Sequence, residues 1–462
     1  MNRNINIFAA IPVLTVCILA GCKVSQPYRQ PESVVGDQYR DQQINDTNTL
    51  ASLPYTELFS DTILQNLIRS GISENLDLKI AYTRITQSRA FFEQSRAAFY
   101  PTLSGTIGAT ESKLTEAQGF GSRTITQFQL GVSAAWEADI WGKLKASRRA
   151  NQAALLQTEA GTRAIATSIV SDIANNYYYL LALDQQLAIT EQTVRNWDTT
   201  VTVMRALKTA ATVTEAAVVQ SEAQRYAAEV TIPDLKQAIR ETENILSVLT
   251  GRVPEAIIRT NLEQQQSPAM LQTGVPSQLL AYRPDVQAAE YAYRNAFELT
   301  NVARTAFYPT LYVNGSAGLS SLTIGGLFDL GAVAASIGAG LTQPIFNRRA
   351  LKTNLVVTTA QQEAALYSFS NSLLLASQEV SNALSLHQHA MEKTNSRTNQ
   401  LTALTKSVAY TQELLRNGFA NYTEVITARQ SLLAAQLGKV NDRLQQLQAT
   451  VNLYRALGGG WK

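Results

Sequence analysis

The chain has 462 residues, of which 16% are charged, and its 39 basic and 36 acidic residues leave a formal net charge of +3. No basic block or aromatic-basic stripe is present, so the sequence gives no indication of nucleic-acid binding. Both cysteines, Cys17 and Cys22, lie at the amino end, which excludes a disulfide framework or a thiol nucleophile from the rest of the chain.

The amino end is typical of an export signal. Arg3 precedes a mostly apolar stretch, Ile5–Ala20, which is too short and too poorly flanked for a membrane span. The stretch ends in LAGC (Leu19–Cys22), the pattern of a bacterial lipoprotein signal. Residues 1–21 are therefore predicted as the signal peptide and Cys22 as the acylated residue. The alternative is an ordinary signal peptide that happens to contain a cysteine.

Two later tracts lack proline. None occurs between Pro101 and Pro233 or after Pro344, and proline breaks helices because it removes a donor and clashes with the preceding turn. Gly142–Lys208 and Asn347–Arg416 are each predicted as a nearly unbroken helix. The first would be about 100 Å long at ~1.5 Å per residue.

Apolar residues recur every seven positions in these tracts and in the last one, which predicts helices packed along coiled-coil seams. The seam positions are Ile173, Leu180, Leu187, Val194 and Val201, then Leu366, Leu373, Val380, His387, Thr394, Leu401, Val408 and Leu415, and finally Leu433, Val440, Leu447 and Tyr454. His387 and His389 are the only histidines. Their i, i+2 spacing points them to different sides of a helix, so we interpret them as packing or tunnel-lining residues and predict no metal site.

The chain also repeats itself. AFYPTL occurs at Ala98–Leu103 and again at Ala306–Leu311, and the seams of the two halves are spaced by a similar interval. This agreement predicts a tandem repeat, with a first unit over residues 22–257 and a second over residues 258–462.

After each AFYPTL the apolar period changes to two, which predicts strands. Ile107 and Val132, for example, alternate with Thr106 and Ser133. The predicted hairpins cover about 101–136 and about 309–342, and each strand of about 10 residues is long enough to cross a bilayer at a tilt. The alternative is two surface hairpins on a soluble helical protein.

No later stretch supplies the roughly 20 consecutive apolar residues of a membrane helix, so a membrane crossing would require a closed barrel. The smallest spanning barrels need about eight strands, and the chain has four. We therefore expect three copies to complete a twelve-stranded membrane β-barrel. The predicted fold class is mainly α, with four strands per protomer and long coiled-coil helices that form an α-barrel.

The chain resembles the outer-membrane factors of tripartite efflux pumps and secretion systems, the TolC-like channels, and is most similar to their lipoprotein OprM-like branch. The resemblance rests on several motifs in the family's order. These are LAGC, the segment that starts ELFSDTILQNL at Glu57, WEADIWGKLK (Trp136–Lys145), RPD (Arg283–Asp285) and VNLYRALGGGW (Val451–Trp461).

The resemblance implies a homotrimer that is lipid-anchored in the outer membrane, with a helical tunnel in the periplasm. It implies a passive exit channel for drugs or other small molecules, handed over by an inner-membrane transporter of the resistance–nodulation–division type and a periplasmic adaptor (membrane fusion) protein. An enzyme is not expected, and the covalent lipid on Cys22 is the only attached group expected. A type I protein secretion exit duct and a lipid-anchored structural coiled-coil protein remain as alternatives.

The long helices are predicted to reverse near Ala206–Ala216 and Leu414–Val425, with Gly418 as a left-handed cap residue. In the family the corresponding turns form the periplasmic tip that meets the adaptor. The candidate adaptor contacts are therefore Ala211, Thr212, Gly418 and Phe419, and plain structural turns are the alternative.

The OprM-like branch carries an inward-facing Leu and, four residues on, an Asp in the helix after the second turn, where they constrict the periplasmic opening. Alignment of NGFANYTEVITARQ with that pattern puts Thr423 and Thr427 at these positions, which excludes a carboxylate ring at Thr427. Tyr422, Thr423, Glu424 and Thr427 are the gate candidates. We expect closure by packing and hydrogen bonds between helix pairs, although these residues could equally be ordinary inter-helix contacts.

Overall fold

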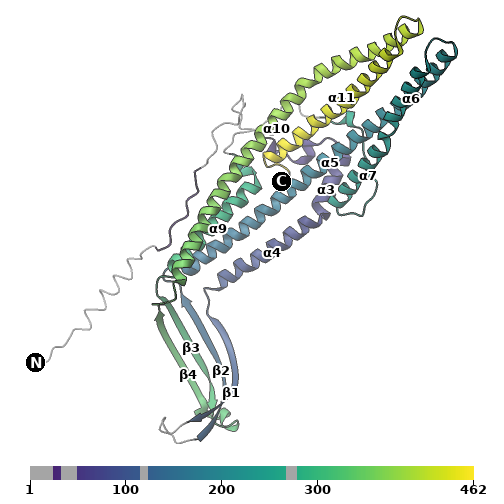
Figure 1. Ribbon diagram of the computed structural model, residues 1–462. Coiled ribbons are helices and arrows are strands. Elements are labelled where there is room, and N and C mark those ends of the chain that lie inside the picture. The colour runs from purple at the N-terminus through teal and green to yellow at the C-terminus, as the bar shows by residue number, and fades with distance from the viewer. Residues whose placement is uncertain (1–23, 33–48, 115–122, 267–277, 462) are drawn as a thin grey trace, which may run out of the picture. The chain divides into compact units, whose positions relative to one another are not determined.

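The computed structural model describes residues 24–32, 49–114, 123–266 and 278–461 (Figure 1). The predicted signal peptide and Cys22 lie outside these ranges. The elements are η1 (Leu50–Ser52), α2 (Tyr55–Leu58), α3 (Thr62–Glu74), α4 (Leu76–Ala97), β1 (Thr102–Leu114), β2 (Arg123–Ala138), α5 (Lys143–Thr209), α6 (Glu215–Glu229), α7 (Thr231–Leu249), η3 (Leu262–Gln264), α8 (Leu279–Tyr282), α9 (Pro284–Thr305), β3 (Thr310–Ser321), η5 (Gly325–Phe328), η6 (Leu330–Ala332), β4 (Val333–Thr342), α10 (Ala350–Arg416) and α11 (Tyr422–Ala456).

Both long helices are confirmed, and each of them has 67 residues. The carboxylate of Asp139 accepts hydrogen bonds from the backbone N–H groups of Leu144 and Lys145 at 2.9 and 3.0 Å, which satisfies free donors at the start of α5. Helix α10 begins three residues later than predicted. Arg348 and Arg349 have φ of 54° and 65°, a left-handed conformation that cannot continue into a right-handed helix.

Local sequence also explains other helix starts. Asp61 precedes α3 and accepts from the N–H of Ile63 at 2.8 Å, and Pro284 occupies the first position of α9, where its missing N–H costs nothing. Asn421 and Glu424 form a capping box at the start of α11. The capping box satisfies two of the N–H groups that every helix amino end leaves free.

The four strands form one antiparallel sheet in the order β1-β2-β3-β4 (Figure 1). They contain 13, 16, 12 and 10 residues, so most are longer than the sequence predicted. The chain is therefore mainly helical with four antiparallel strands, as expected. Within the described ranges, no helix is both long enough and apolar enough to cross a membrane.

The described chain divides into two compact units. The first contains residues from 1–32, 85–158 and 289–369, and the second contains residues from 33–84, 159–288 and 370–462. Each unit therefore draws on both of the predicted repeats. The two compact units therefore do not coincide with the two predicted repeats.

The core of the second unit follows the predicted seams. Ile173 and Leu180 on α5, Val380 on α10 and Leu447 on α11 are each at most 1% exposed. Tyr177 and Tyr454 are among the largest fully buried side chains. Long-range packing of these seams, more than intrinsic helix propensity, stabilises helices of this length.

Candidate functional site

The register of the sheet separates its side chains into two faces. Gly105 lies opposite Val132 and Ile107 opposite Leu130, so the apolar residues of β1 and β2 share one face. The same face continues across β3 and β4 through the pairing of Gly315 with Ile337. Ile107 is 83% exposed and Ile337 is 86% exposed. An apolar face of this kind is typical of a surface that contacts lipid or a partner.

The opposite face of the sheet is polar. A row of serines crosses all four strands, because Ser104 pairs with Ser133, Ser133 with Ser316, and Ser316 with Ser336. The hydroxyls of Ser316 and Ser336 lie 2.8 Å apart. One face thus suits hydrocarbon and the other suits water, as expected for strands that separate lipid from an aqueous lumen.

The two outer strands, β1 and β4, pair on one side only within the described residues. Their outer backbone groups therefore lack strand partners in the single chain. In an apolar medium each such group costs several kcal/mol if it is left unpaired, by an order-of-magnitude estimate of about 2–7 kcal/mol. In lipid, the sheet would therefore need further strands at both edges.

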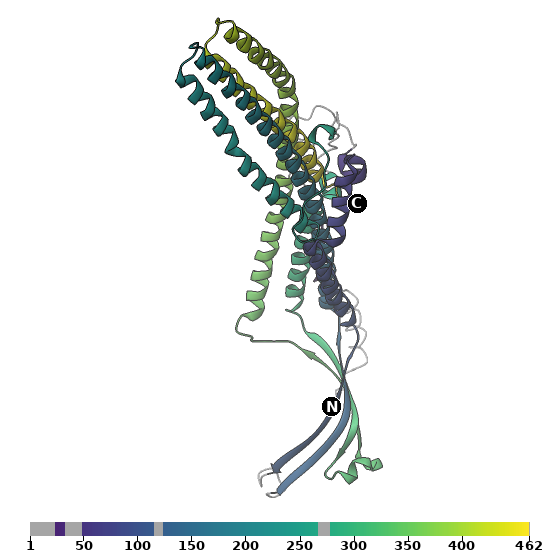
Figure 2. The same ribbon diagram turned by 90° about the vertical axis from the view of Figure 1, so that its right-hand side faces the viewer.

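The predicted chain reversals join α5 to α6 and α10 to α11, and these two helical hairpins lie side by side (Figures 1 and 2). Gly418 has φ of +76°, which confirms the predicted left-handed cap. The N–H of Phe419 donates to the carbonyl of Leu414 at 2.8 Å, and that of Gly418 donates to the carbonyl of Leu415 at 3.1 Å. These two bonds form a Schellman motif.

The candidate adaptor contacts lie at the two hairpin ends. Ala211, Thr212, Gly418 and Phe419 are all exposed, and the Phe419 side chain is 81% exposed. The two ends are joined by a shared hydrophobic cluster that contains Met204, Ala217, Val218, Leu415 and Val425. The four candidates therefore belong to one surface region, formed by both hairpins.

The gate candidates lie on the first turns of α11. Thr423 and Thr427 are exposed, and the Thr427 hydroxyl donates to the carbonyl of Thr423 at 2.9 Å. The Glu424 carboxylate accepts from the N–H of Asn421 at 3.4 Å. Tyr422 packs against the hydrophobic clusters around Val425 and Trp197. Each of these residues has a local partner, and Thr423 and Thr427 face outward from the single chain.

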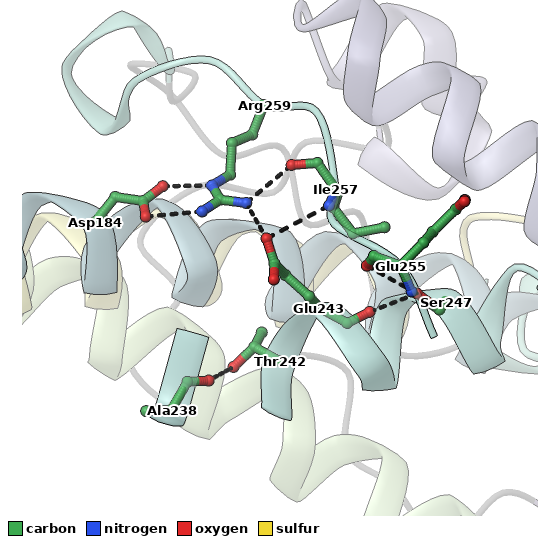
Figure 3. Close-up of polar contacts among 8 residues, drawn as sticks. All are labelled: Asp184, Ala238, Thr242, Glu243, Ser247, Glu255, Ile257 and Arg259. Carbon is green, nitrogen blue, oxygen red and sulfur yellow. Dashed lines mark hydrogen bonds and ion pairs between the residues drawn. The ribbon is translucent and has the colours of Figure 1, made fainter. Parts of the chain in front are cut away.

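Sequence reasoning missed a clamp in the second unit, which Figure 3 shows. Arg259, in the segment after α7, donates to both carboxylate oxygens of Asp184 on α5 and to Glu243 on α7, each within 2.9 Å. These hydrogen bonds raise the pKa of Arg259, with Asp184 as the largest cause. No short motif marks this residue, because its partners are 75 and 16 positions away.

A second network fixes the same segment to α3. Asp61 accepts from the hydroxyls of Tyr177 at 2.8 Å and Thr260 at 2.5 Å, and from the Gln265 amide at 2.9 Å. Burial raises the pKa of the Asp61 carboxyl, but the hydrogen bonds from Thr260, Tyr177 and Gln265 outweigh it and leave the pKa below its usual value. Fully satisfied carboxylates of this kind hold structure and leave no oxygen free for chemistry.

The RPD motif also proves to be structural. Arg283 is buried and forms a two-bond pair with Asp285 at 2.9 and 2.6 Å. Its remaining nitrogen donates to Glu379 at 2.7 Å and to the carbonyl of Ala456 at 3.0 Å. The motif therefore ties the start of α9 to α10 and to the end of α11.

The histidines lie apart from any cluster of ligands. His389 pairs with Glu392 at 3.1 Å on the same helix, and burial lowers the pKa of His387. In the part of the chain that the structure describes, no three His, Cys, Asp or Glu residues gather as metal ligands would.

Comparisons with known proteins agree with this geometry. The model of the outer membrane efflux protein family matches residues 67–252 and 275–459. The solvent efflux pump outer membrane protein SrpC of Pseudomonas putida is 26% identical, with 98% of each chain covered. The "Probable outer membrane lipoprotein SilC" of Salmonella typhimurium is 25% identical, again with 98% of each chain covered. The outer-membrane channel OprN superimposes with a TM-score of 0.89 at 23% identity, over 95% of this chain and 100% of that one.

The fold, the two-faced sheet and a family match over most of the chain all indicate the same family. They confirm the resemblance seen in the sequence. This chain belongs to the outer membrane efflux protein family and is an outer-membrane efflux channel, a transport protein and not an enzyme.

Proposed function

We propose that three copies of this chain form the exit duct of a tripartite efflux pump. The observation that carries the proposal is the four-stranded sheet with one exposed apolar face, one polar face and two outer strands that pair on one side only. Three such sheets, joined edge to edge, give twelve strands, and closure would satisfy the outer backbone groups of β1 and β4.

Assembly is tested with the purified full-length protein in mild detergent. Light scattering should give the mass of three chains while circular dichroism shows the helical fold. Ile107→Asp should impair membrane assembly more than the matched change Thr106→Asp, because only Ile107 lies on the apolar face. A folded monomer, or equal effects of the two substitutions, would contradict the proposal.

The transported molecules are proposed to be small organic compounds, because SrpC, which resembles this chain over 98% of its residues, is named for solvent efflux. The energy would come from an inner-membrane transporter of the resistance–nodulation–division type. Expression in a host that lacks its own exit duct, together with a matching transporter and adaptor, should restore resistance to solvents or drugs. Restored secretion of a protein substrate, without resistance, would favour a type I secretion duct instead.

The adaptor is proposed to contact the hairpin ends, which are exposed and lie together in one surface region. Single cysteines at Ala211 and Phe419 should crosslink to cysteines in the adaptor in cells. Crosslinks from positions near Phe120 alone, in the predicted loop between β1 and β2 that lies outside the described residues, would refute this orientation.

The lipid anchor is proposed to be carried by Cys22, in agreement with the lipoprotein name of SilC. Cys22→Ser should abolish incorporation of labelled palmitate. The same label incorporation in the variant as in the unchanged protein would rule out this assignment. Channel function can persist, because the sheet gives a second attachment to the membrane.

The gate is proposed to close by packing and hydrogen bonds between helix pairs. Thr427 carries a neutral hydroxyl, which donates to a carbonyl of its own helix, so three copies of this residue would not form an acidic ring. Thr427→Asp should therefore add a block of single-channel conductance by divalent cations. A strong divalent block in the unchanged protein, abolished by changes at another acidic residue, would show that the gate lies elsewhere.

A further inference from the structure

Arg429 on α11 is a half-buried cation without an acidic partner among the described residues. Its guanidinium lies 5.7 Å from the ring centre of Trp197 and donates to the backbone carbonyl of Asn196 at 3.2 Å. Its other nitrogens face the side-chain oxygen of Gln412, once the amide of Gln412 is oriented to accept from them. Burial alone lowers the pKa of Arg429, whereas carboxylates raise that of Arg259.

The equivalent pair of residues in the other hairpin forms an ion pair. Arg205 and Glu222 join α5 to α6 through an ion pair. The equivalent positions, 207 residues further on, are occupied by Gln412 and Arg429. The second hairpin therefore has an arginine where the first has the carboxylate of Glu222, and a neutral amide where the first has the guanidinium of Arg205.

A cavity of about 490 Å³ opens beside Arg429, between α5, α10 and α11. Among the described residues, no acidic side chain lines it, and Arg429 is the single charged lining residue. Gln192 and Gln436 supply amide groups, while Ile189, Val408 and Leu432 form an aliphatic wall. A neighbouring cavity of about 680 Å³ differs, because Asp442 and Glu263 line it together with its arginines.

Arg429 has N–H groups that its hydrogen bonds to Asn196 and Gln412 do not use. A guanidinium carries five N–H groups, and the bonds to Asn196 and Gln412 use three of them. Two N–H groups therefore remain for a planar anion, and the low polarity of a half-buried site strengthens such charge-assisted bonds. A cationic residue opposite an apolar wall selects a ligand with a charged end and an apolar body.

We propose that this cavity binds a small aromatic carboxylate, with the carboxylate on the guanidinium of Arg429 and the ring against Ile189, Val408 and Leu432. The site lies wholly within the second compact unit of one chain. The inference therefore does not depend on the proposed trimer or on the transport role, and binding can be measured on the isolated protein.

The test uses full-length protein in non-ionic detergent and equilibrium dialysis of 2-naphthoate, with the neutral 2-naphthamide as the matched probe. Naphthoate should bind saturably, one molecule per chain, and naphthamide at least about tenfold more weakly, because charge-assisted hydrogen bonds are roughly twice as strong as neutral ones. Arg429→Gln should weaken naphthoate binding by a similar factor.

Gln412→Glu makes the test sharper. It keeps Arg429 but supplies an internal carboxylate, so naphthoate binding should fall on the order of tenfold while the fold is retained or stabilised. Arg416→Gln is the control, because Arg416 is exposed and does not line the cavity. Arg416→Gln should bind naphthoate as tightly as the unchanged protein does.

Equal binding of the two probes, or unchanged binding in Arg429→Gln, would overturn the proposal. So would loss of the oligomer in Arg429→Gln without any saturable naphthoate binding to the unchanged protein, since a side chain of a second copy would then be the partner of Arg429. Circular dichroism of each variant separates these outcomes from misfolding.

Discussion

The α5–α6 and α10–α11 hairpins share one backbone geometry but are held together by different forces. Ala211 and Gly418, 207 positions apart, both have positive φ, at 56° and 76°. The same pair of capping hydrogen bonds follows each helix, since Ala211 and Thr212 donate to the carbonyls of Lys208 and Leu207, both at 2.9 Å. The turns are therefore copies of one structure.

The contacts below the turns differ. Within the described residues, the first hairpin is joined by the ion pairs Lys208–Glu215, Arg205–Glu222 and Asp198–Arg225. The equivalent pairs of the second hairpin are Leu415–Tyr422, Gln412–Arg429 and Thr405–Leu432. Leu415 is buried, and Tyr422 packs against its cluster. The two hairpins thus share their backbone geometry, but ion pairs join the first at positions where the second has apolar packing and one neutral–cationic pair.

The far ends of the two predicted repeats show a closer correspondence. Gly251 and Gly458, again 207 apart, end α7 and α11 with φ of 70° and 92°. Asn75 donates to the carbonyl of Leu249 at 3.0 Å, and Arg283 donates to that of Ala456 at 3.0 Å. We propose on this basis that the chain consists of two repeats, over 22–257 and 258–462, that share their helix ends.

The largest expected effect is at these glycines. A Cβ at Gly458 would lie 2.3 Å from the carbonyl oxygen of Tyr282, and one at Gly251 would lie 2.6 Å from that of Glu74. Gly458→Ala and Gly251→Ala should each lower the free energy of unfolding by about 3 kcal/mol, from left-handed strain and overpacking together. Thermal unfolding followed by circular dichroism measures this. If either variant unfolds like the unchanged protein, the shared helix end is not a structural requirement.

The residues that reach these helix ends should come next. Arg283→Ala should cost about 2–3 kcal/mol, because it leaves Asp285 and Glu379 without their cation and a carbonyl without its donor. Asn75→Ala should cost about 1 kcal/mol, because it removes a neutral hydrogen bond and a helix cap. The same unfolding measurement compares them. Equal losses of unfolding free energy in Arg283→Ala and Asn75→Ala would mean that the ion pairs of Arg283 add nothing to its hydrogen bond with the helix end.

Substitutions at the two turn residues test directly whether the α5–α6 and α10–α11 turns share one backbone geometry. Gly418→Ala should destabilise the second hairpin by about 1 kcal/mol, and Ala211→Gly should stabilise the first by up to about 1 kcal/mol, because glycine alone adopts positive φ without strain. No atom would lie within 4 Å of a Cβ at Gly418. A loss of stability in Gly418→Ala would therefore come from backbone strain and not from a steric clash. Hydrogen exchange at the two turns gives the local stability, and changes of the same sign in both variants would contradict the expectation.

The smallest effect concerns the ion pairs. Glu215→Gln should destabilise the first hairpin by only about 0.5 kcal/mol, since Lys208 and Glu215 are about half exposed (49% and 60%). This loss should vanish at high salt, where exposed pairs are screened. Hydrogen exchange at low and high salt measures it. The expectation would be contradicted if the stability of the α10–α11 hairpin depended on salt and that of the α5–α6 hairpin did not.

Much of the fold follows from local sequence. The absence of proline and the seven-residue period determine α5 and α10, because helix geometry depends on neighbours a few residues away. The two-residue period after each AFYPTL determines the four strands in the same way. Gly418 was identified as a left-handed cap because few other residues adopt that conformation. Ala211 was not, since no local rule predicts alanine at positive φ, and only the structure shows its left-handed conformation.

Tertiary structure decided which distant residues meet. Arg259 finds Asp184 and Glu243 through the path of the segment after α7 (Figure 3). Arg283 meets Glu379 across 96 positions. Within the described ranges, Arg429 meets neutral groups only, the carbonyl of Asn196 and the amide of Gln412. The sequence by itself determined the main elements and the family, and it predicted the repeat. The division into two units that mix both repeats, and the charge left unpaired at Arg429, depend on side chains brought together by packing over long separations, which no local period encodes.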